Sequence, residues 1–309
     1  MARMRAEKTM TNKEIADYLI TNRREMRVRR GRPCPICDHT DWCLCLDDGS
    51  AALCRRSDGT GSVKQYGSYG HLHITSSGLS TQTTKLPRLV KKPERTDAEL
   101  NDVWRPRAEK WRERGRNEIN RLAMTLGVGA KALRELGTGW DGKAWTFPEK
   151  NGKGLVVGVS RRFEDGAKRC AVGSRRGLTY SNGWRDRKGA VLIVEGASDV
   201  ASGITLGLAA VGRPSNIGGL KMLSELLSGT KRKVIVVGER DRKADGRWPG
   251  MEGCQSIAMG LGKSLRRSVS AKLLPDGAKD LRSWLIGQRV DIYSAVARAK
   301  AGQELLRQL

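Results

Sequence analysis

Runs of branched apolar residues alternate with amphipathic segments in the last third of the chain. The stretches AVLIVEG (190–196) and KVIVVG (233–238) have the continuous apolar character of strands that are buried on both faces. Each is followed by a helical pattern, and VSAKLLP (269–275) is expected to form a third strand. Strands that alternate with helices predict a parallel sheet, so we assign this region to the α/β class.

The pattern upstream of this region changes several times. Thr11 is expected to cap a helix, because Glu14 three residues later completes a capping box. Residues 76–97 show no periodicity and contain two prolines and an excess of basic residues, so we interpret them as a linker. The remaining predictions are a helix over 11–28, small β-structure over 31–75, helices over 98–137, short strands with glycine turns over 143–181 and a terminal helix over 291–309.

The charge of the chain points to a polyanionic partner. Lysine and arginine outnumber aspartate and glutamate by 58 to 33, which gives a formal charge of +25 spread over all 309 residues. Such an excess repels itself unless a partner such as nucleic acid neutralises it, although a solubility property of the surface is the alternative. No apolar run reaches the roughly 20 residues of a membrane span, and the first residues lack the apolar segment of a signal peptide. We therefore expect a cytoplasmic protein with no membrane partner.

Five of the seven cysteines lie between residues 34 and 54. In a reducing compartment this clustering favours a metal site over disulfides. Cys34-Pro-Ile-Cys37 has the spacing of a metal knuckle, and four thiolates complete a closed, structural zinc site. We take Cys43 as the third ligand and Cys54 as the fourth, with Cys45 as the alternative to Cys43. Further candidate ligands are His39, His71 and His73, and the alternative to a metal site is a set of buried free cysteines.

Carboxylates follow two of the predicted buried strands. Glu195 follows the first, and Glu239 and Asp241 follow the second. In an open parallel sheet, ligands bind at the carboxyl ends of the strands, so neighbouring strands would bring these three groups together. Like charges at such a distance require a cation, and carboxylate oxygens suit Mg²⁺ or Mn²⁺.

At this point the sequence resembles a known family. VEGASD (Val194 to Asp199) and the later acidic pair are similar to the two signatures of the TOPRIM domain, which occurs in bacterial-type primases, topoisomerases, some nucleases and recombination mediators. PDGAKDLRSWL (275–285) resembles the segment after the third strand in TOPRIM primases and adds Asp280. The order of cysteine knuckle, basic middle region and TOPRIM-like region is also that of primases of the bacterial and phage type, and the resemblance covers most of residues 30–286.

The resemblance implies nucleotidyl transfer at a metal held by the catalytic residues Glu195, Glu239, Asp241 and Asp280. Asp199 is either linked to the metal or an ordinary acid of a first helical turn. The chain departs from the family in having Glu239-x-Asp241 where Asp-x-Asp is usual, and in carrying an insertion, RKADGRWPGMEG (242–253). In the family, the basic middle region holds template and incoming nucleotide, and the matching residues here are Arg161, Arg162, Lys168, Arg175 and Arg176.

The predicted organisation is a TOPRIM parallel-sheet domain preceded by a small β zinc ribbon and a mixed α+β basic domain. The expected boundaries are an N-terminal helix at 1–28, a zinc ribbon at 29–75, a basic linker at 76–97, a helical and β nucleic-acid-binding region at 98–187, the TOPRIM catalytic domain at 188–286 and a C-terminal helix at 287–309.

The expected function is synthesis of short RNA primers on single-stranded DNA from ribonucleoside triphosphates. The cofactors would be structural Zn²⁺ and catalytic Mg²⁺ or Mn²⁺. The chain contains no nucleotide-triphosphatase loop, so we expect any replicative helicase partner to be a separate protein. Two alternatives stay open. One is a non-enzymatic zinc and TOPRIM DNA-binding protein of the recombination-mediator type, and the other is a metal-dependent TOPRIM nuclease.

Overall fold

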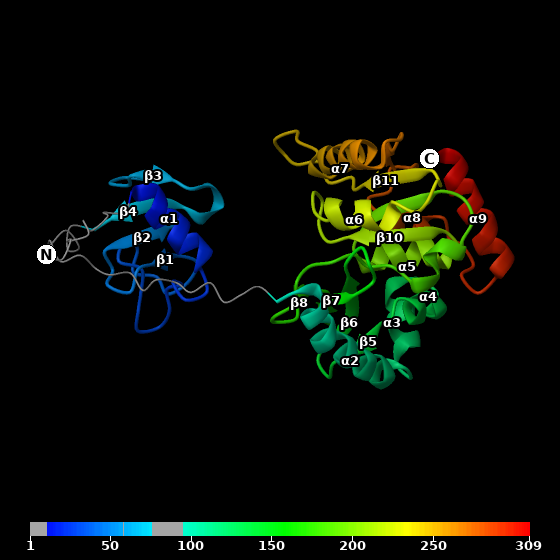
Figure 1. Cartoon of the computed structure of the whole chain (residues 1–309), viewed down its shortest axis with the longest axis horizontal. Coiled ribbons are helices and arrows are strands. Elements are labelled where there is room, and N and C mark those ends of the chain that lie inside the picture. The colour runs from blue at the N-terminus through cyan, green and yellow to red at the C-terminus, as the bar shows by residue number, and fades with distance from the viewer. Residues whose placement is uncertain (1–10, 58, 76–94) are drawn as a thin grey trace, which may run out of the picture. The chain divides into compact units, whose positions relative to one another are not determined.

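The computed structural model describes residues 11–57, 59–75 and 95–309. They fall into two compact units, divided between Lys92 and Pro93, which are shown in Figure 1 and described separately below. Most of the predicted linker, 76–94, lies outside the described residues.

The N-terminal unit consists of one helix and a four-stranded antiparallel sheet. The helix α1 (Asn12–Thr21) begins with the predicted capping box, in which Thr11 and Glu14 each bond the other's backbone. It is shorter than the predicted helix over 11–28, because the Asn22 side chain bonds the carbonyl of Tyr18 and the chain then turns. The strands, in the spatial order β1-β2-β4-β3, are β1 (Leu44–Cys45), β2 (Ala51–Cys54), β4 (His71–Ile74) and β3 (Lys64–Gln65), with a 3-10 turn η1 (Gly67–Tyr69).

The helix α1 shares its core with this sheet. Ala16 and Leu19 are fully buried and belong to one core cluster with Leu53 of β2 and Leu72 of β4. A separate small cluster on the same sheet contains the cysteines. The apolar core of the unit is therefore small, which makes any bound metal important for its stability.

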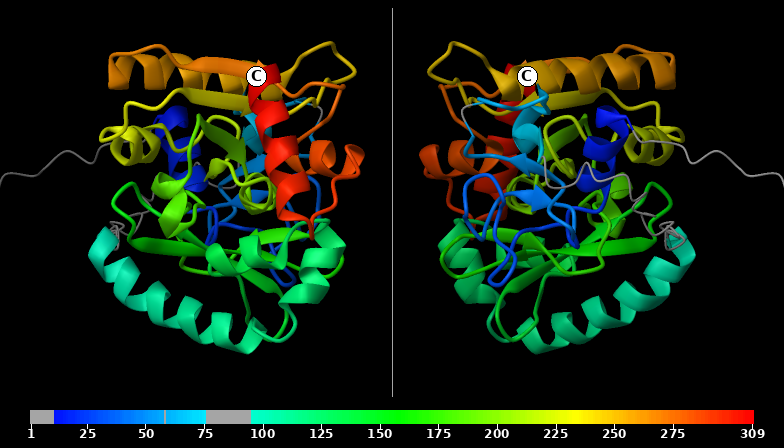
Figure 2. Two further views of the ribbon diagram at one scale, coloured as in Figure 1. Left: turned by 90° about the vertical axis from the view of Figure 1, so that its right-hand side faces the viewer. Right: turned by 90° about the vertical axis from the view of Figure 1, so that its left-hand side faces the viewer.

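The C-terminal unit begins with helices and a second antiparallel sheet. The helices are α2 (Asp97–Gly115), α3 (Ile119–Leu126) and α4 (Ala130–Glu135). The strands run in the order β5 (Gly139–Trp140), β6 (Trp145–Lys150), β7 (Val156–Arg162) and β8 (Lys168–Cys170). Trp104 of α2 is buried against Val157 and Val159 of β7, so the long helix covers one face of this sheet, as Figure 2 shows.

The rest of the unit is built on a parallel sheet of four strands. In spatial order they are β10 (Ala209–Arg213), β9 (Val191–Glu195), β11 (Val234–Gly238) and β12 (Ser270–Leu273). The predicted parallel sheet is confirmed, and β9 and β11 are direct neighbours. The sequence patterns indicated three of its strands, and the structure adds β10 as a fourth. Its sequence, AAVGR, is short and mildly apolar, so it lacks the strong pattern of its neighbours.

Successive strand residues point to opposite faces of the parallel sheet, and each face has its own core. Ile235 and Val237 belong to the core shared with α5 (Ala197–Thr205), α8 (Leu281–Gly287) and α9 (Ala295–Gln308). Val234 and Val236 belong to the core shared with α6 (Leu220–Leu227) and α7 (Pro249–Leu265), to which Trp184 of the short turn η3 (Asn182–Asp186) also contributes. Both faces are thus covered, which leaves the carboxyl edge of the sheet as the place for polar side chains. None of the helices in the described ranges is both long and apolar enough to cross a membrane.

Candidate metal centres and basic pocket

The four cysteines predicted as zinc ligands converge in the N-terminal unit. Cys34 and Cys37 lie in a tight turn, which is closed by the Cys34 N–H donating to the carbonyl of His39 over 2.9 Å. Cys43 directly precedes β1, and Cys54 is the last residue of β2. Because β1 and β2 pair as antiparallel neighbours, their cysteines are brought to the same end of the sheet as the knuckle.

The spacing of the sulfur atoms fits a tetrahedral zinc ion. One Sγ from each of the four residues lies within 4.8 Å of the others. The Cys37–Cys43 distance between sulfurs is 3.8 Å, and the Cys43–Cys54 distance is 3.9 Å. Four sulfurs at about 2.3 Å from a zinc ion at the centre of a tetrahedron would be about 3.8 Å apart. The donor set and its geometry therefore fit structural zinc.

Cys45 does not belong to this group. It is buried in β1, and its thiol has Arg32 and Asp47 as charged neighbours.

The thiols of the four-sulfur group differ in their pKa values. Burial raises the pKa of Cys43 to about 11. Burial would also raise the pKa of Cys37, but hydrogen bonds from the His39 backbone N–H and from neighbouring thiols outweigh it, so this pKa falls to about 7. Metal binding must displace protons from the buried thiols, so zinc binding should weaken at low pH.

The acidic centre of the C-terminal unit lies at the carboxyl edge of the parallel sheet. Glu239 directly follows β11, Asp199 lies in the first turn of α5 after β9, and Asp280 immediately precedes α8 after β12. One carboxylate oxygen from each of the three lies within 4.8 Å of the other two. Strand pairing therefore joins residues that are 81 positions apart in the sequence.

Backbone groups hold two of these carboxylates in place. Asp199 accepts a hydrogen bond of 2.9 Å from the N–H of Arg282 in α8. Asp280 is the N-cap of the same helix and accepts a 2.7 Å bond from the N–H of Ser283. The start of α8 thus fixes both side chains, since unpaired N–H groups at a helix N-terminus favour carboxylates.

The pKa values of two carboxylates in the cluster are raised, as expected where buried acids lack enough positive charge nearby. The pKa of Asp199 is raised to about 8, first by burial and then by the charge of Asp280. The pKa of Glu239 is also raised, first by burial and then by the charges of Glu195 and Asp280. Mutual repulsion of buried carboxylates is relieved by a cation, and oxygen ligands suit Mg²⁺ or Mn²⁺. The donor set therefore fits a divalent metal ion.

The structure places the other two predicted carboxylates differently. Glu195 is near enough to Glu239 to raise its pKa, but its Oε2 lies 3.9 Å from Nη2 of Arg213. Asp241 accepts a 2.7 Å bond from the N–H of Gly250, near the start of α7. Neither belongs to the three-carboxylate group, so their assignment as metal ligands stays a prediction. Asp199, for which the sequence left two interpretations open, lies within the group.

A basic pocket lies beside α5 in the same unit. Gly196, Ala197 and Ser198 at the start of α5 form one wall. Four of the five predicted nucleic-acid-binding residues contribute to the lining, together with two arginines that the sequence did not single out: Arg161, Arg162, Lys168, Arg176, Arg169 and Arg213. The charge of Lys168 partly offsets the rise in the pKa values of Asp199 and Glu239, so the pocket and the acidic centre adjoin.

Some of these cations have carboxylate partners. Arg176 Nε lies 3.0 Å from the buried carboxylate of Glu149, and Arg161 Nε lies 2.6 Å from Asp141. Arg162 has a lowered pKa, because it is partly buried and faces the charge of Arg282. Arg175, the fifth predicted residue, pairs with Asp97 and does not line the pocket.

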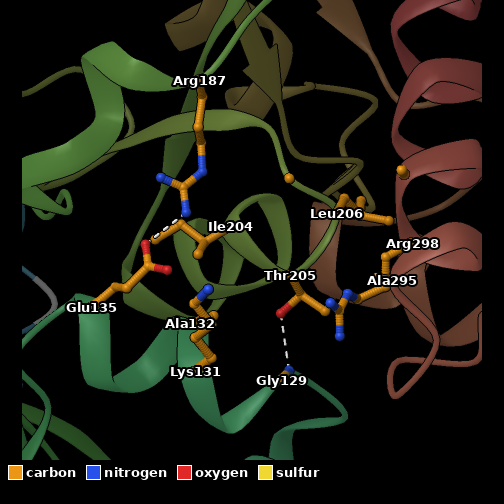
Figure 3. Close-up of a pocket in the computed structure, with 12 residues that line it drawn as sticks. Gly129, Lys131, Ala132, Glu135, Arg187, Ile204, Thr205, Leu206, Ala295 and Arg298 are labelled. Atoms are coloured by element: carbon orange, nitrogen blue, oxygen red, sulfur yellow. Dashed lines mark hydrogen bonds and ion pairs between the residues drawn. The ribbon is translucent and has the colours of Figure 1, made fainter.

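Figure 3 shows another pocket, which is lined by Ile204 and Thr205 at the C-terminal end of α5. Asp199 lies in the first turn of this helix, at its other end. Two pairs of the pocket's polar groups bond each other, since Arg187 Nη2 lies 2.6 Å from Glu135 and the Thr205 hydroxyl accepts a 2.9 Å bond from the Gly129 N–H. The hydroxyl of Thr205 also donates to the carbonyl of Ala201 over 2.7 Å. We assign no chemistry to this pocket.

Comparison with known proteins finds structural likeness without sequence relatives. No protein-family model matches the chain, and no curated protein matches it. The zinc-binding and RNA polymerase domains of the Aquifex aeolicus primase are similar in structure with a TM-score of 0.50 at 16% identity, over 70% of this chain and 62% of that one.

Two further solved structures are similar at lower scores. A primase catalytic domain bound to single-stranded DNA has a TM-score of 0.48 at 15% identity, over 65% of this chain and 78% of that one. The primase fragment of the bacteriophage T7 primase-helicase protein has a TM-score of 0.39 at 14% identity, over 55% of this chain and 71% of that one. The likeness to the Aquifex structure confirms the predicted α/β fold class for this chain.

Proposed function

We propose that this protein is a primase-like nucleotidyltransferase that makes short RNA primers on single-stranded DNA. The observation that carries the proposal is that an acidic group and a basic pocket adjoin each other in the C-terminal unit. Three carboxylates that fit a divalent cation adjoin a pocket lined by six basic residues. Nucleotide triphosphates and template strands are polyanions, and their reaction requires a metal. The fold that carries these features is similar to the zinc-binding and RNA polymerase domains of a bacterial primase.

The roles of the residues follow from their positions. Asp199, Glu239 and Asp280 would hold Mg²⁺ or Mn²⁺, which would supply positive charge against the negative charge that develops during in-line displacement. Of the three carboxylates, Glu239 is joined most directly to the sheet, because it is the first residue after the central strand β11. A rigid strand holds a functional side chain more precisely than a loop does.

The basic pocket would hold phosphates of the template or of the incoming nucleotide. Lys168 and Arg162 have no carboxylate within ion-pair distance among the described residues, so both charges can serve a ligand. Contacts of lysine and arginine with phosphates give affinity without reading the base sequence. The cysteine site of the N-terminal unit would bind structural Zn²⁺.

The proposal is tested with labelled ribonucleoside triphosphates, single-stranded DNA and Mg²⁺ or Mn²⁺, resolving both new RNA and template fragments. We expect short RNA products from the parent protein. Glu239→Gln keeps the shape of the side chain and removes the charge that attracts the metal, so its rate should fall by about a hundredfold or more. Glu239→Asp restores the acid usual in the family and should retain activity or change the preference between the two metals.

Each outcome separates the candidate functions. Template fragments without RNA products would favour a nuclease. If the protein binds DNA but yields neither RNA nor template fragments, and if Glu239→Gln leaves the DNA affinity unchanged, a non-enzymatic binding protein is favoured. Synthesis by Glu239→Gln at the parent rate would remove Glu239 from the catalytic centre. Circular dichroism of the variant serves as the control for folding.

A further inference from the structure

Arg213 is a buried cation at the carboxyl edge of the parallel sheet. Its side chain is fully buried, and it is the last residue of β10, paired in register with Glu195 of β9. Arginine stays protonated in proteins, so this position carries a permanent positive charge. A buried charge is strongly unfavourable unless it is paired and hydrogen-bonded, so its partners reveal why it is tolerated.

The guanidinium of Arg213 reaches across three strands. Nη2 donates to the carbonyl of Val237 in β11 over 3.2 Å and lies 3.9 Å from Oε2 of Glu195. Nη1 donates to the backbone carbonyl of Asn216 and lies 3.3 Å from its Oδ1. The atom Nε is buried and has no partner among the described residues. The side chain therefore ties the ends of β10, β9 and β11 together directly beside the acidic centre.

The same network continues into the insertion. The Asn216 side chain donates to the carbonyl of Pro249, the first residue of α7. A Cβ atom on Gly253 would collide with the amide group of Asn216, so only glycine permits this close approach. The next backbone N–H, that of Gly250, donates to Asp241. Of these two carboxylates Glu195 faces a buried cation, whereas Asp241 accepts a backbone N–H bond, as Asp199 and Asp280 also do.

We propose that Arg213 is a positioning residue that acts as a built-in cation for Glu195, so that the acidic centre binds a single divalent metal ion, at Asp199, Glu239 and Asp280. Other centres for phosphoryl transfer use two metal ions, which stabilise the attacking and leaving oxygens and bring additional positive charge to the site. Here the guanidinium supplies that charge beside Glu195, and it holds the carboxylate in place through an ion pair that crosses from β10 to β9. This inference shares one assumption with the proposed function, namely that the three-carboxylate group binds the metal ion.

The inference is tested by counting bound Mn²⁺ ions on the full, zinc-loaded chain by electron paramagnetic resonance. We expect one Mn²⁺ per chain in the parent protein. Arg213→Gln removes the positive charge and leaves Glu195 free to bind metal, so a second Mn²⁺ should bind or the first should bind about tenfold more tightly. Glu195→Gln should leave the count at one. In the double variant Arg213→Gln/Glu195→Gln the gain caused by Arg213→Gln should disappear, because it acts through Glu195.

Two further variants separate charge from structure. Arg213→Lys keeps the charge and should bind one Mn²⁺ with nearly the parent affinity. Arg232 is the matched control, since it also donates to backbone carbonyls, including that of Gly189 over 2.7 Å, but lies just before β11, at the opposite end of the sheet. Arg232→Gln should lower the melting temperature without changing Mn²⁺ binding.

Two Mn²⁺ ions on the parent protein, or loss of the first Mn²⁺ in Glu195→Gln, would overturn the inference. So would weaker Mn²⁺ binding by a folded Arg213→Gln variant. If Arg213→Gln does not fold, Glu195→Gln and Arg213→Lys decide the question by the same count. Because the readout is metal binding, a protein that fails to make primers can still support the inference, and a protein that makes them can still overturn it.

Discussion

The two candidate metal centres of this protein differ in chemistry and in construction. The cysteine centre uses four soft thiolates from a segment of 21 residues, which complete a tetrahedron by themselves. The acidic centre uses three hard carboxylates, which follow three different strands, and three protein oxygens leave room for water or substrate around Mg²⁺. A closed centre can hold a small unit together, whereas an open one can take part in a reaction.

The surroundings of the two centres strengthen this difference. The cysteines lie in a unit with a small apolar core, so the energy of metal binding contributes to folding. The carboxylates lie at the edge of a sheet with an extensive core on each face, which would fold without a metal and hold the carboxylates together despite their repulsion. Removal of metal should therefore unfold the first unit and inactivate the second.

The largest expected effect is on the cysteine centre. Cys43→Ser should lose the zinc ion and unfold the N-terminal unit, because zinc binding to such sites contributes on the order of 10 kcal/mol. Cys45→Ser is the matched control, since Cys45 lies two residues away in the same sheet but outside the four-sulfur group. Metal analysis combined with hydrogen exchange over β2 and β11 measures both units. Full zinc in Cys43→Ser and none in Cys45→Ser would reverse our choice of ligand.

A second test separates folding from catalysis at Asp280. Asn is as good an N-cap as Asp, so Asp280→Asn should preserve α8 and the melting temperature while Mn²⁺ binding and primer synthesis fall by about a hundredfold or more. Asp280→Ala should show the same functional loss and a further loss of about 1 kcal/mol in the free energy of unfolding. Parent-like synthesis by Asp280→Asn would exclude its carboxylate from the metal site.

The pH dependence of stability is expected to follow Asp199. Its pKa is raised to about 8 in the folded state by burial, against about 3.9 for an unfolded chain. Between these values the folded protein binds the extra proton, so the stability of the metal-free C-terminal unit should fall as the pH rises through this window. Mg²⁺ should therefore raise the melting temperature more at about pH 8 than at about pH 5.5. Asp199→Asn should remove most of this difference; a difference of the same size in the variant would assign it to other groups.

The smallest expected effect concerns phosphate binding. Lys168 lines the basic pocket, whereas Arg175 pairs with Asp97 outside it. Lys168→Ala should lower the slope of log affinity against log salt for single-stranded DNA by about 0.7, the value for one phosphate contact. Arg175→Ala should leave the slope nearly unchanged. Equal slopes for the two variants, measured by fluorescence anisotropy, would argue against this pocket as the phosphate site.

Sequence patterns anticipated the elements that have strong local signals. The capping box at Thr11, the strands that end at Glu195 and Gly238 and the helices α5 and α7 were all predicted, because apolar periodicity and caps depend on nearby residues. The strand β10 was missed, and Arg213 was missed with it. Its five residues, AAVGR, become a strand because they pair with β9, and pairing depends on residues far away in the sequence.

The candidate sites show the same division. The sequence indicated that Glu239 and Asp280 were important, but it could not decide the role of Asp199 or separate Glu195 and Asp241 from the group. Those distinctions depend on where α8 begins and on the guanidinium that reaches Glu195 from the neighbouring strand. Among the basic residues, Arg161, Arg162, Lys168 and Arg176 line one pocket, whereas Arg175 is diverted to a carboxylate in another helix.

By itself the sequence determined the kinds of donor atoms, their order along the chain and the alternation of strands and helices, because these follow from residue type and short-range periodicity. It also determined the cysteine centre almost completely, since four thiols within 21 residues can meet through one turn and one strand pair. Only the tertiary structure decided which three carboxylates meet. Strand pairing and the start of α8 bring together residues up to 81 positions apart, and the energy for holding them there comes from the two cores of the sheet.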